Sequence, residues 1–461
     1  MANSMGGGYE YGKLYRSEEK VYPREVKGRF ATLRRIAMFV LLGAFYGGPW
    51  LRWDGRQAIL FDLPERKFYI FEMTMWPQDF IYLALLLIIL AVSLFFFTAL
   101  AGRLWCGYAC PQTVWTEAFT WIEMAVEGDR SKRIKLDKGP WTFEKIRKKA
   151  LKQFLWIVLA LFTGFSFVGY FVDVRTLATS LLSLEASGWT YFWVFFYSFA
   201  TYGNAGFMRE QVCKYMCPYA RFQGAMFDHD SLIITYDAER GEPRGSRKKG
   251  SDYKAQGLGD CVDCTMCVQV CPTGIDIRNG LQYECIACAA CIDACDSVMD
   301  KVGYPHGLIR YSTERALEHK KYRLFRPRTI VYTAILTLLL ALMVSLIALR
   351  KPVILDVIRD RNALYRDVGR AGIENNYTIR VINKHNEDHE YELTVSGIEG
   401  IAITQDTRFS LSGESVHTLP VSVTVPHEYA SGGHVIEFRL EATDGSGISM
   451  TEESRFRGPM E

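Results

Sequence analysis

The sequence predicts a polytopic α-helical membrane protein with about five spans, an inserted cysteine-rich domain and a C-terminal all-β sandwich. Three observations predict this class: separate apolar runs long enough to cross a membrane, two dense cysteine runs before the last of them, and alternating strand patterns after residue 350. The 461 residues suffice for two or three domains, and the mean hydropathy of +0.00 fits an average over membrane and soluble parts. A net charge of +3 gives no argument for nucleic acid as a partner.

Apolar runs predict the membrane spans, because a helix crosses the hydrocarbon with roughly 20 apolar residues. We expect spans near Ile36–Leu51, Phe80–Leu100, Phe154–Val172, Thr190–Tyr202 and Ile330–Leu349. The fourth is the weakest, because its apolar core is short and Glu185 limits its extension. Nothing before Ile36 resembles a cleavable signal, so we expect the first span to be retained as an anchor.

Basic residues predict the orientation of these spans. Lys and Arg are dense in the tail before Ile36, between Arg130 and Lys152, and between Arg310 and Arg328. Basic loops stay in the cytoplasm, so we expect the N-terminus and the cysteine-rich segment inside and the chain after Leu349 outside. An N-terminus inside and a C-terminal domain outside require an odd number of spans, so the fourth span must be counted. The charge pattern therefore supports the fourth span independently of its hydropathy.

Two cysteine runs carry the strongest chemical signal. "CVDCTMCVQVCP" and "CIACAACIDACD" each read C-x2-C-x2-C-x3-C, the ligand run of bacterial two-cluster ferredoxins, in which the fourth cysteine of each run reaches the other cluster. Disulfides are unfavoured in a cytoplasmic loop, and doubled runs of four have no common zinc counterpart. The second run departs from the pattern at Asp296, where Pro is expected. The spacing assigns one [4Fe–4S] cluster to Cys261, Cys264, Cys267 and Cys295, and a second to Cys271, Cys285, Cys288 and Cys291.

A second cysteine motif occurs twice, each time after a predicted span. Cys106 and Cys110 lie in "CGYACP", and Cys213 and Cys217 lie in "CKYMCP", on the same side of the membrane as the ferredoxin runs. We infer an internal repeat about an axis along the membrane normal, which brings the four thiols together. A third iron–sulfur cluster, a soft metal such as Cu(I), and inert buried thiols are all open. We predict a catalytic or metal-binding role for the four.

After Lys351 the sequence alternates with period two in "YTIRVIN", "YELTVSG", "VHTLPVSVTV" and "HVIEFRLEA". Turn signals every 8–12 residues predict an antiparallel, immunoglobulin-like β-sandwich of about seven strands. The expected division is a cytoplasmic tail (1–35), a four-span membrane domain (36–230), a strand and basic linker (231–258), a two-cluster ferredoxin-like domain (259–312), a connector with the fifth span (313–350) and the sandwich (351–461).

The chain resembles the FixG/CcoG/RdxA family of cytochrome c oxidase accessory proteins over essentially its whole length. The resemblance is carried by "VYPREVKGRF", "WDGRQAILFDLPERKFYIF", "AGRLWCGYACPQTVWTE", "CKYMCPYARFQGAMFD", the double ferredoxin run and "MDKVGYPHGLIRY". It implies a polyferredoxin of the bacterial inner membrane that helps to assemble cbb3-type cytochrome c oxidase and reduces Cu(II) to Cu(I). The implied partners are copper as substrate, and assembly proteins of that oxidase or a copper transporter.

Two other classes of function are open. The protein could deliver electrons from a quinol or a soluble donor to another redox protein, or serve as a non-catalytic assembly scaffold. Copper reduction requires the membrane-face cysteines, electron delivery does not, and a scaffold predicts redox-silent clusters. No dinucleotide or flavin motif identifies the electron donor, and a homodimer is also compatible with the sequence.

Overall fold

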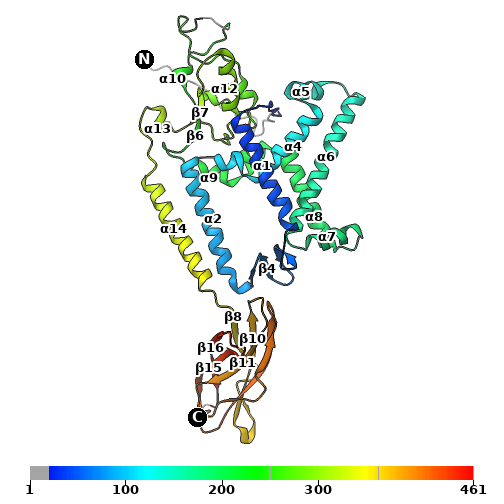
Figure 1. Cartoon of the computed structure of the whole chain (residues 1–461), viewed down its shortest axis with the longest axis vertical. Coiled ribbons are helices and arrows are strands. Elements are labelled where there is room, and N and C mark those ends of the chain that lie inside the picture. Colours follow the sequence, from blue (N-terminus) through cyan, green and yellow to red (C-terminus); the bar gives the residue numbers. More distant parts are fainter. Residues whose placement is uncertain (1–19, 249–251, 362, 460–461) are drawn as a thin grey trace, which may run out of the picture. The chain divides into compact units, whose positions relative to one another are not determined.

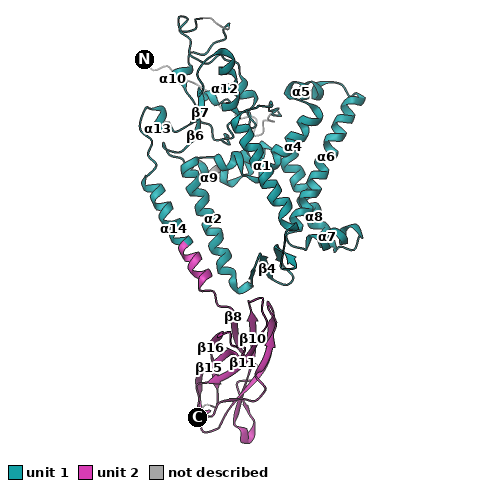
Figure 2. Cartoon of the chain, in the orientation of Figure 1, with its two compact units in different colours: residues 1–340 teal, residues 341–461 magenta. Residues whose placement is uncertain are grey.

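The computed structural model describes residues 20–248, 252–361 and 363–459. The chain divides into two compact units, residues 1–340 and 341–461, and the boundary falls within helix α14 (Figure 2). Residues 1–19 of the predicted tail, 249–251 of the predicted linker and 460–461 of the predicted sandwich lie outside the described residues.

Four helical segments of the described chain are long and apolar enough to cross a membrane. They match the first, second, third and fifth predicted spans. Only 17% of the apolar window around α2 and 6% of that of α14 is buried within the chain, so these side chains require another apolar surrounding, such as lipid. The segments are α1 with the 3₁₀ turn η1 (Arg29–Trp50), η2 with α2 (Pro77–Ala101), α6 (Phe143–Val168) and α14 (Pro327–Ala348).

The fourth predicted span coincides with α8 (Gly188–Thr201). This helix has 14 residues and is continued by a π-helix, η3 (Tyr202–Met208). It is not among the four segments that are long enough by themselves. The fifth crossing therefore stays a prediction.

Short elements connect the long helices of the first unit. Between α1 and α2 the chain forms a two-stranded and a three-stranded antiparallel sheet, with β1 (Arg52–Trp53), β2 (Arg56–Gln57), β3 (Ile59–Asp62), β4 (Lys67–Ile70) and β5 (Met73–Met75). After α2 come α3 (Leu104–Tyr108), α4 (Pro111–Glu127) and α5 (Arg130–Lys138), and α7 (Val174–Leu182) joins α6 to α8. After η3 come a second π-helix, η4 (Val212–Met216), and α9 (Pro218–Met226).

The cysteine-rich domain is closed by two strands from its two ends. β6 (Ile233–Tyr236), which corresponds to the strand predicted at 231–237, pairs antiparallel with β7 (Ile309–Ser312). The predicted linker therefore begins after this strand. Between the strands lie α10 (Ala238–Gly241), α11 (Met266–Gln269), η5 (Ile277–Asn279) and α12 (Ala290–Val302), and α13 (Glu314–Leu317) follows β7. Figure 1 shows α10, α12, β6 and β7 beyond the end of α2 that lies next to α9.

The second unit contains two antiparallel sheets that enclose one apolar core. Tyr377, Phe438 and Phe456 are among its buried side chains. One sheet has the order β12-β14-β10-β8 with β9 beside β10, and the other has the order β13-β11-β15-β16. The strands are β8 (Val353–Arg359), β9 (Arg366–Asp367), β10 (Ile373–Asn383), β11 (His389–Ser396), β12 (Ala402–Ile403), β13 (Arg408–Leu411), β14 (Val416–Val425), β15 (Gly433–Ala442) and β16 (Ser449–Arg457), with a 3₁₀ turn η6 (Gly369–Ala371).

Candidate redox site

The eight cysteines of the dense runs gather around two small cavities. These are the two groups of four that the spacing predicts, including the exchange of the fourth cysteine between runs. Cys267 also touches the second cavity. The first is lined by Cys261, Cys264, Cys267 and Cys295, and the second by Cys271, Cys285, Cys288 and Cys291.

The loops between the first three cysteines of each run fold alike. Asp263 and Ala287, two residues after the first cysteine, have φ of +50° and +53°. Thr265 and Ala289, four residues after it, have φ of +55° and +59°, and they precede α11 and α12. Left-handed residues at alternate positions turn backbone N–H groups to the inside of a loop, which favours an anionic group there.

The surroundings of these thiols fit an iron–sulfur cluster. Ile275 and Ile277 line the second cavity, and Met299 and Leu308 line the first. Burial raises the pKa of the Cys267 thiol to about 11 and those of Cys285 and Cys295 to about 12, so binding of iron must displace these protons. A bound [4Fe–4S] cluster supplies one-electron transfer.

Asp296, the departure from the ferredoxin pattern, has a structural partner. Its carboxylate Oδ1 accepts a hydrogen bond from the N–H of Gly307 at 3.1 Å. The bond ties α12 to the loop before β7.

The two Cys-x3-Cys-Pro turns have the same local conformation. Cys110 (φ −62°, ψ 128°) and Cys217 (φ −75°, ψ 113°) cap the N-termini of α4 and α9. Pro111 and Pro218 occupy the first helical position, where a missing N–H costs nothing. Each capping cysteine also donates its N–H to the carbonyl five residues before it. The repeat is thus present in the backbone as well as in the sequence.

The match extends to the residue four places before the first cysteine of each pair. Gly102 has φ 55° and ψ −126°, and Arg209 has φ 43° and ψ −113°. A side chain is excluded at Gly102, where a Cβ atom would lie 2.3 Å from the carbonyl oxygen of Leu232. Arg209 adopts the same backbone conformation although it carries a side chain, which is held by an ion pair with Glu123.

Reciprocal hydrogen bonds join the two turns. Gln112, just after the first pair, donates from Nε2 to the carbonyls of Asn204 (2.9 Å) and Arg209 (3.1 Å), just before the second pair. Arg103, just before the first pair, donates from Nη2 to the carbonyl of Ala220 (2.8 Å), just after the second. The start of each turn is therefore bonded to the end of the other.

This arrangement brings the four thiols together. Cys213 interacts electrostatically with Cys106, Cys110 and Cys217, and burial raises its pKa to about 12. The amide of Gln223 on α9 donates to Sγ of Cys106 at 3.6 Å. Cys213 thus lies within electrostatic reach of the other three thiols.

The first turn packs directly on the ferredoxin-like domain. A Cβ atom at Gly107 would lie 2.7 Å from the carbonyl oxygen of Ile286 and 2.9 Å from Cα of Cys288. Cys106 packs against the apolar cluster that contains both of these residues. The four-thiol group thus adjoins the loop that carries cysteines of the second cavity.

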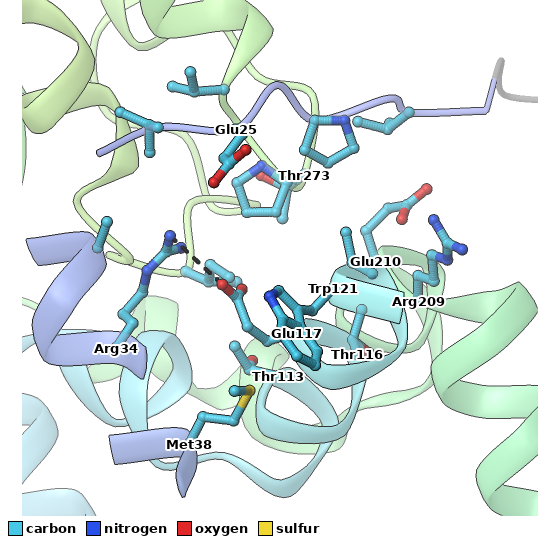
Figure 3. A pocket seen from close by; sticks show the side chains of 18 of the residues that line it. Glu25, Arg34, Met38, Thr113, Thr116, Glu117, Trp121, Arg209, Glu210 and Thr273 are labelled. Atoms are coloured by element: carbon cyan, nitrogen blue, oxygen red, sulfur yellow. Dashed lines mark ion pairs between the residues drawn. The ribbon is translucent and has the colours of Figure 1, made fainter. Parts of the chain in front are cut away.

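A cavity of about 130 Å³ borders the four-thiol group at Cys213. Figure 3 shows it between α1, α4, the segment around Arg209 and the loop that carries Thr273. Arg34 and Glu117 form an ion pair across it at 3.8 Å, and Trp121 and Cys213 belong to its wall. A small molecule or ion in this cavity would be next to the Cys213 thiol.

Sequence reasoning did not identify two contacts that position the site. The first joins α1 to the ferredoxin-like domain: the carboxylate of Asp293 accepts the N–H groups of Phe30 (3.2 Å) and Ala31 (2.7 Å). Asp293 therefore caps the N-terminus of α1 from another domain, and its position among the cysteines of the second run gave no sign of this.

The second contact is a buried group of charges around Glu123. This side chain is 0% exposed and lies near Arg133 (3.3 Å), Lys152 (3.4 Å) and Arg209 (3.0 Å). Burial alone would raise the pKa of Glu123, but the surrounding cations, Arg209 first among them, lower it to about 2. The sequence signal was a carboxylate in the segment after the first cysteine pair, followed by a basic segment.

Family models match segments that contain these sites. A model for a "4Fe-4S dicluster domain" matches residues 208–314, and one for a "4Fe-4S binding domain" matches residues 83–135. A model for the "IG-like fold at C-terminal of FixG" matches residues 343–459, which confirms the predicted immunoglobulin-like class. The chain is therefore an iron–sulfur electron-transfer protein, and its four candidate spans indicate membrane association.

Curated relatives extend over nearly the whole chain. Protein RdxB of Cereibacter sphaeroides is 44% identical over 89% of this chain and 88% of its own length. Nitrogen fixation protein FixG of Rhizobium meliloti is 39% identical (90% and 88%), and protein RdxA of Cereibacter sphaeroides is 40% identical (94% and 91%). The crystal structure of a FixG-related protein from Vibrio parahaemolyticus is 33% identical over 24% of this chain and 98% of its own, with a TM-score of 0.22. From these full-length relatives, the chain belongs to the FixG/RdxA family.

Proposed function

We propose that the protein reduces Cu(II) to Cu(I) and that this Cu(I) supplies the assembly of a cbb3-type cytochrome c oxidase. The resemblance of the whole chain to oxidase accessory proteins supports the oxidase as destination. The acceptor half-reaction, Cu(II) plus one electron giving Cu(I), matches the one-electron chemistry of [4Fe–4S] clusters. A copper transporter or an assembly protein of that oxidase would receive the product.

The contact between Gly107 and the loop Ile286–Cys288 is the observation that carries the proposal. It leaves no room for a side chain between the first cysteine turn and the second ferredoxin-like site. The four-thiol group is therefore the part of the membrane domain best placed to exchange electrons with that site. Arg103, 5% exposed, fixes this junction further by donating from Nη1 to the backbone of Tyr283.

The cavity next to Cys213 supports a small acceptor. Its volume of about 130 Å³ is large enough for a hydrated metal ion. Glu117 and Glu210 belong to its wall and carry the oxygen ligands that suit Cu(II), and Cys213 borders the same cavity. Reduction thus takes place beside the four-thiol group.

The charge pattern supports the placement of these parts in the bacterial inner membrane. The basic segments around α5 and before α14 favour a cytoplasmic position for the four-thiol group and the ferredoxin-like domain. The β-sandwich then lies in the periplasm. Copper is reduced on the cytoplasmic side in this arrangement.

Anaerobic copper reduction by the purified full-length protein tests the proposal. The protein is reduced with dithionite, freed of excess reductant and mixed with Cu(II) and a chromophoric Cu(I) chelator. We expect Cu(I) to appear as the clusters are reoxidised and their visible absorbance recovers, and an iron-free preparation to produce none. Equal Cu(I) formation by the iron-free protein would reject the proposal. Electron delivery to a partner protein with no copper turnover would favour the electron-delivery alternative.

A further inference from the structure

The four membrane-face cysteines form a donor set of their own. Each repeat contributes one cysteine before and one at the N-terminus of a helix, and reciprocal hydrogen bonds hold the two turns together. All four side chains are partly buried. Four thiols that converge from two matching turns make a symmetric site, whereas isolated packing cysteines need no such match.

The four membrane-face thiols are not arranged around a single metal ion in the described part of the chain. Within the described residues, no group of three or more His, Cys, Asp or Glu side chains is placed to hold one ion. The eight described ferredoxin-type cysteines also form no single-ion group, although their sequence pattern specifies polynuclear clusters. A polynuclear cluster is thus compatible with the arrangement of the four membrane-face thiols.

The surroundings of the four thiols suit such an occupant. A cluster with four thiolate ligands is anionic, and the buried guanidinium of Arg103 interacts electrostatically with Cys106 and Cys213. Arg103 Nε is buried and has no hydrogen-bond partner in the described part of the chain. The amide of Gln223 already points an N–H at Sγ of Cys106, the kind of contact that tunes cluster potentials.

The family models add an independent argument. The segment matched as a 4Fe-4S binding domain, residues 83–135, contains Cys106 and Cys110 and no other cysteine. Two thiols cannot complete a four-cysteine ligand set. The structure supplies the missing pair from the second repeat, Cys213 and Cys217, which lie inside the other matched segment.

We propose that Cys106, Cys110, Cys213 and Cys217 together bind a third [4Fe–4S] cluster, shared between the two repeats. Copper is then a substrate that comes to this site through the cavity and does not reside on the four thiols. The inference does not rest on copper reduction, since iron stoichiometry is independent of the acceptor.

Iron and acid-labile sulfide per chain, measured on the full-length protein after anaerobic reconstitution in detergent, test this assignment. We expect about 12 iron atoms in the wild type and about 8 in the double variant Cys110→Ser/Cys217→Ser. The variant Thr113→Ser, in the same turn, serves as the control and should keep about 12. The proposal would be overturned by about 8 iron atoms in the wild type. It would also be overturned by about one copper per chain in the wild type that is absent from the double variant.

A second variant covers the case in which the double variant fails to fold. Gln223→Leu keeps every thiol and removes the N–H donor to Cys106. We expect its iron content to stay at the wild-type level while, in a redox titration followed by electron paramagnetic resonance, one of three components moves to a lower potential. Two components that titrate as in the wild type, with no third, would contradict a cluster at these cysteines.

Discussion

The guanidinium of Arg209 lies 3.0 Å from the carboxylate of Glu123, and this buried pair joins the second cysteine turn to the helix that follows the first. Arg209 has φ of +43°, a conformation that costs a non-glycine residue on the order of 1–3 kcal/mol. A hydrogen bond from its Nε to the carbonyl of Gly206 (2.8 Å) and the ring of Trp156 below the cation, at 5.4 Å, help to hold it there. The carboxylate thus stabilises a strained residue four places before Cys213.

Glu123→Gln should be strongly destabilising. The substitution leaves Arg133, Lys152 and Arg209 buried without their common carboxylate, and removing one partner of a buried ion pair costs about 3–5 kcal/mol. Thermal unfolding in detergent, followed by far-ultraviolet circular dichroism, measures the loss. Glu144→Gln, which removes an exposed carboxylate of α6, should change stability by less than about 0.5 kcal/mol.

The same carboxylate predicts how stability depends on pH. The pKa of Glu123 is lowered from 4.5 to about 2 by folding, so its contribution is complete above pH 4.5 and is lost as the pH falls toward 2. The melting temperature of the wild type should therefore decrease more steeply across this range than that of Glu123→Gln. Parallel pH profiles for the two proteins would contradict the role assigned to the carboxylate.

Gly107→Ala should disturb the junction between the thiol turn and the ferredoxin-like domain. The added methyl group meets the backbone of Ile286, and overpacking of this kind costs about 1–3 kcal/mol. We expect slower Cu(I) formation at unchanged iron content, because the two redox sites are moved apart. Gly43→Ala is the matched control, since a Cβ atom there meets nothing within 4 Å. Wild-type rates in Gly107→Ala would show that electrons do not cross this contact.

Asp293→Ala should loosen the attachment of α1 to the ferredoxin-like domain. Loss of a capping carboxylate costs about 0.5–2 kcal/mol, and here two N–H groups lose their acceptor. We expect a lower melting temperature and faster limited proteolysis at the junction. Asp300→Ala on the same helix removes an exposed carboxylate and serves as the control. Equal cleavage rates for both variants would rule out the capping role.

Filling the cavity beside Cys213 should slow copper reduction without loss of iron. Thr120 belongs to the cavity wall, and Thr120→Trp places a large ring in a space of about 130 Å³. Ala125→Trp adds the same ring to the exposed side of the same helix. The chelator assay should show reduced rates only for Thr120→Trp. If both variants match the wild type, copper reaches the site by another path.

The β-sandwich should be sensitive to truncation of its central aromatic residue. Phe438 is 0% exposed and packs edge-on against Tyr377, with ring centroids 5.1 Å apart. Phe438→Ala should cost about 3–5 kcal/mol in urea unfolding of the C-terminal unit. Val435→Ala, at a position 57% exposed, should cost far less. Similar midpoints for the two variants would contradict the assigned core.

The parts of the site that the sequence predicts are those that local spacing determines. Cys261, Cys264 and Cys267 are close because the chain between them is short, and period-two alternation identifies the sandwich strands. The contact at Gly107, the cap by Asp293 and the charges around Glu123 join segments far apart in the chain, where one sequence gives no pairing information. The fourth predicted span, Thr190–Tyr202, coincides with α8, but no feature of Tyr202–Met208 in the sequence predicts the π-helix that continues it.

The matched turns have a consequence for how the molecule is made. Half of the four-thiol group belongs to each repeat, so the proposed third cluster can be inserted only after Cys217 has reached the folded first half. Two copies of one repeat would provide the same four thiols.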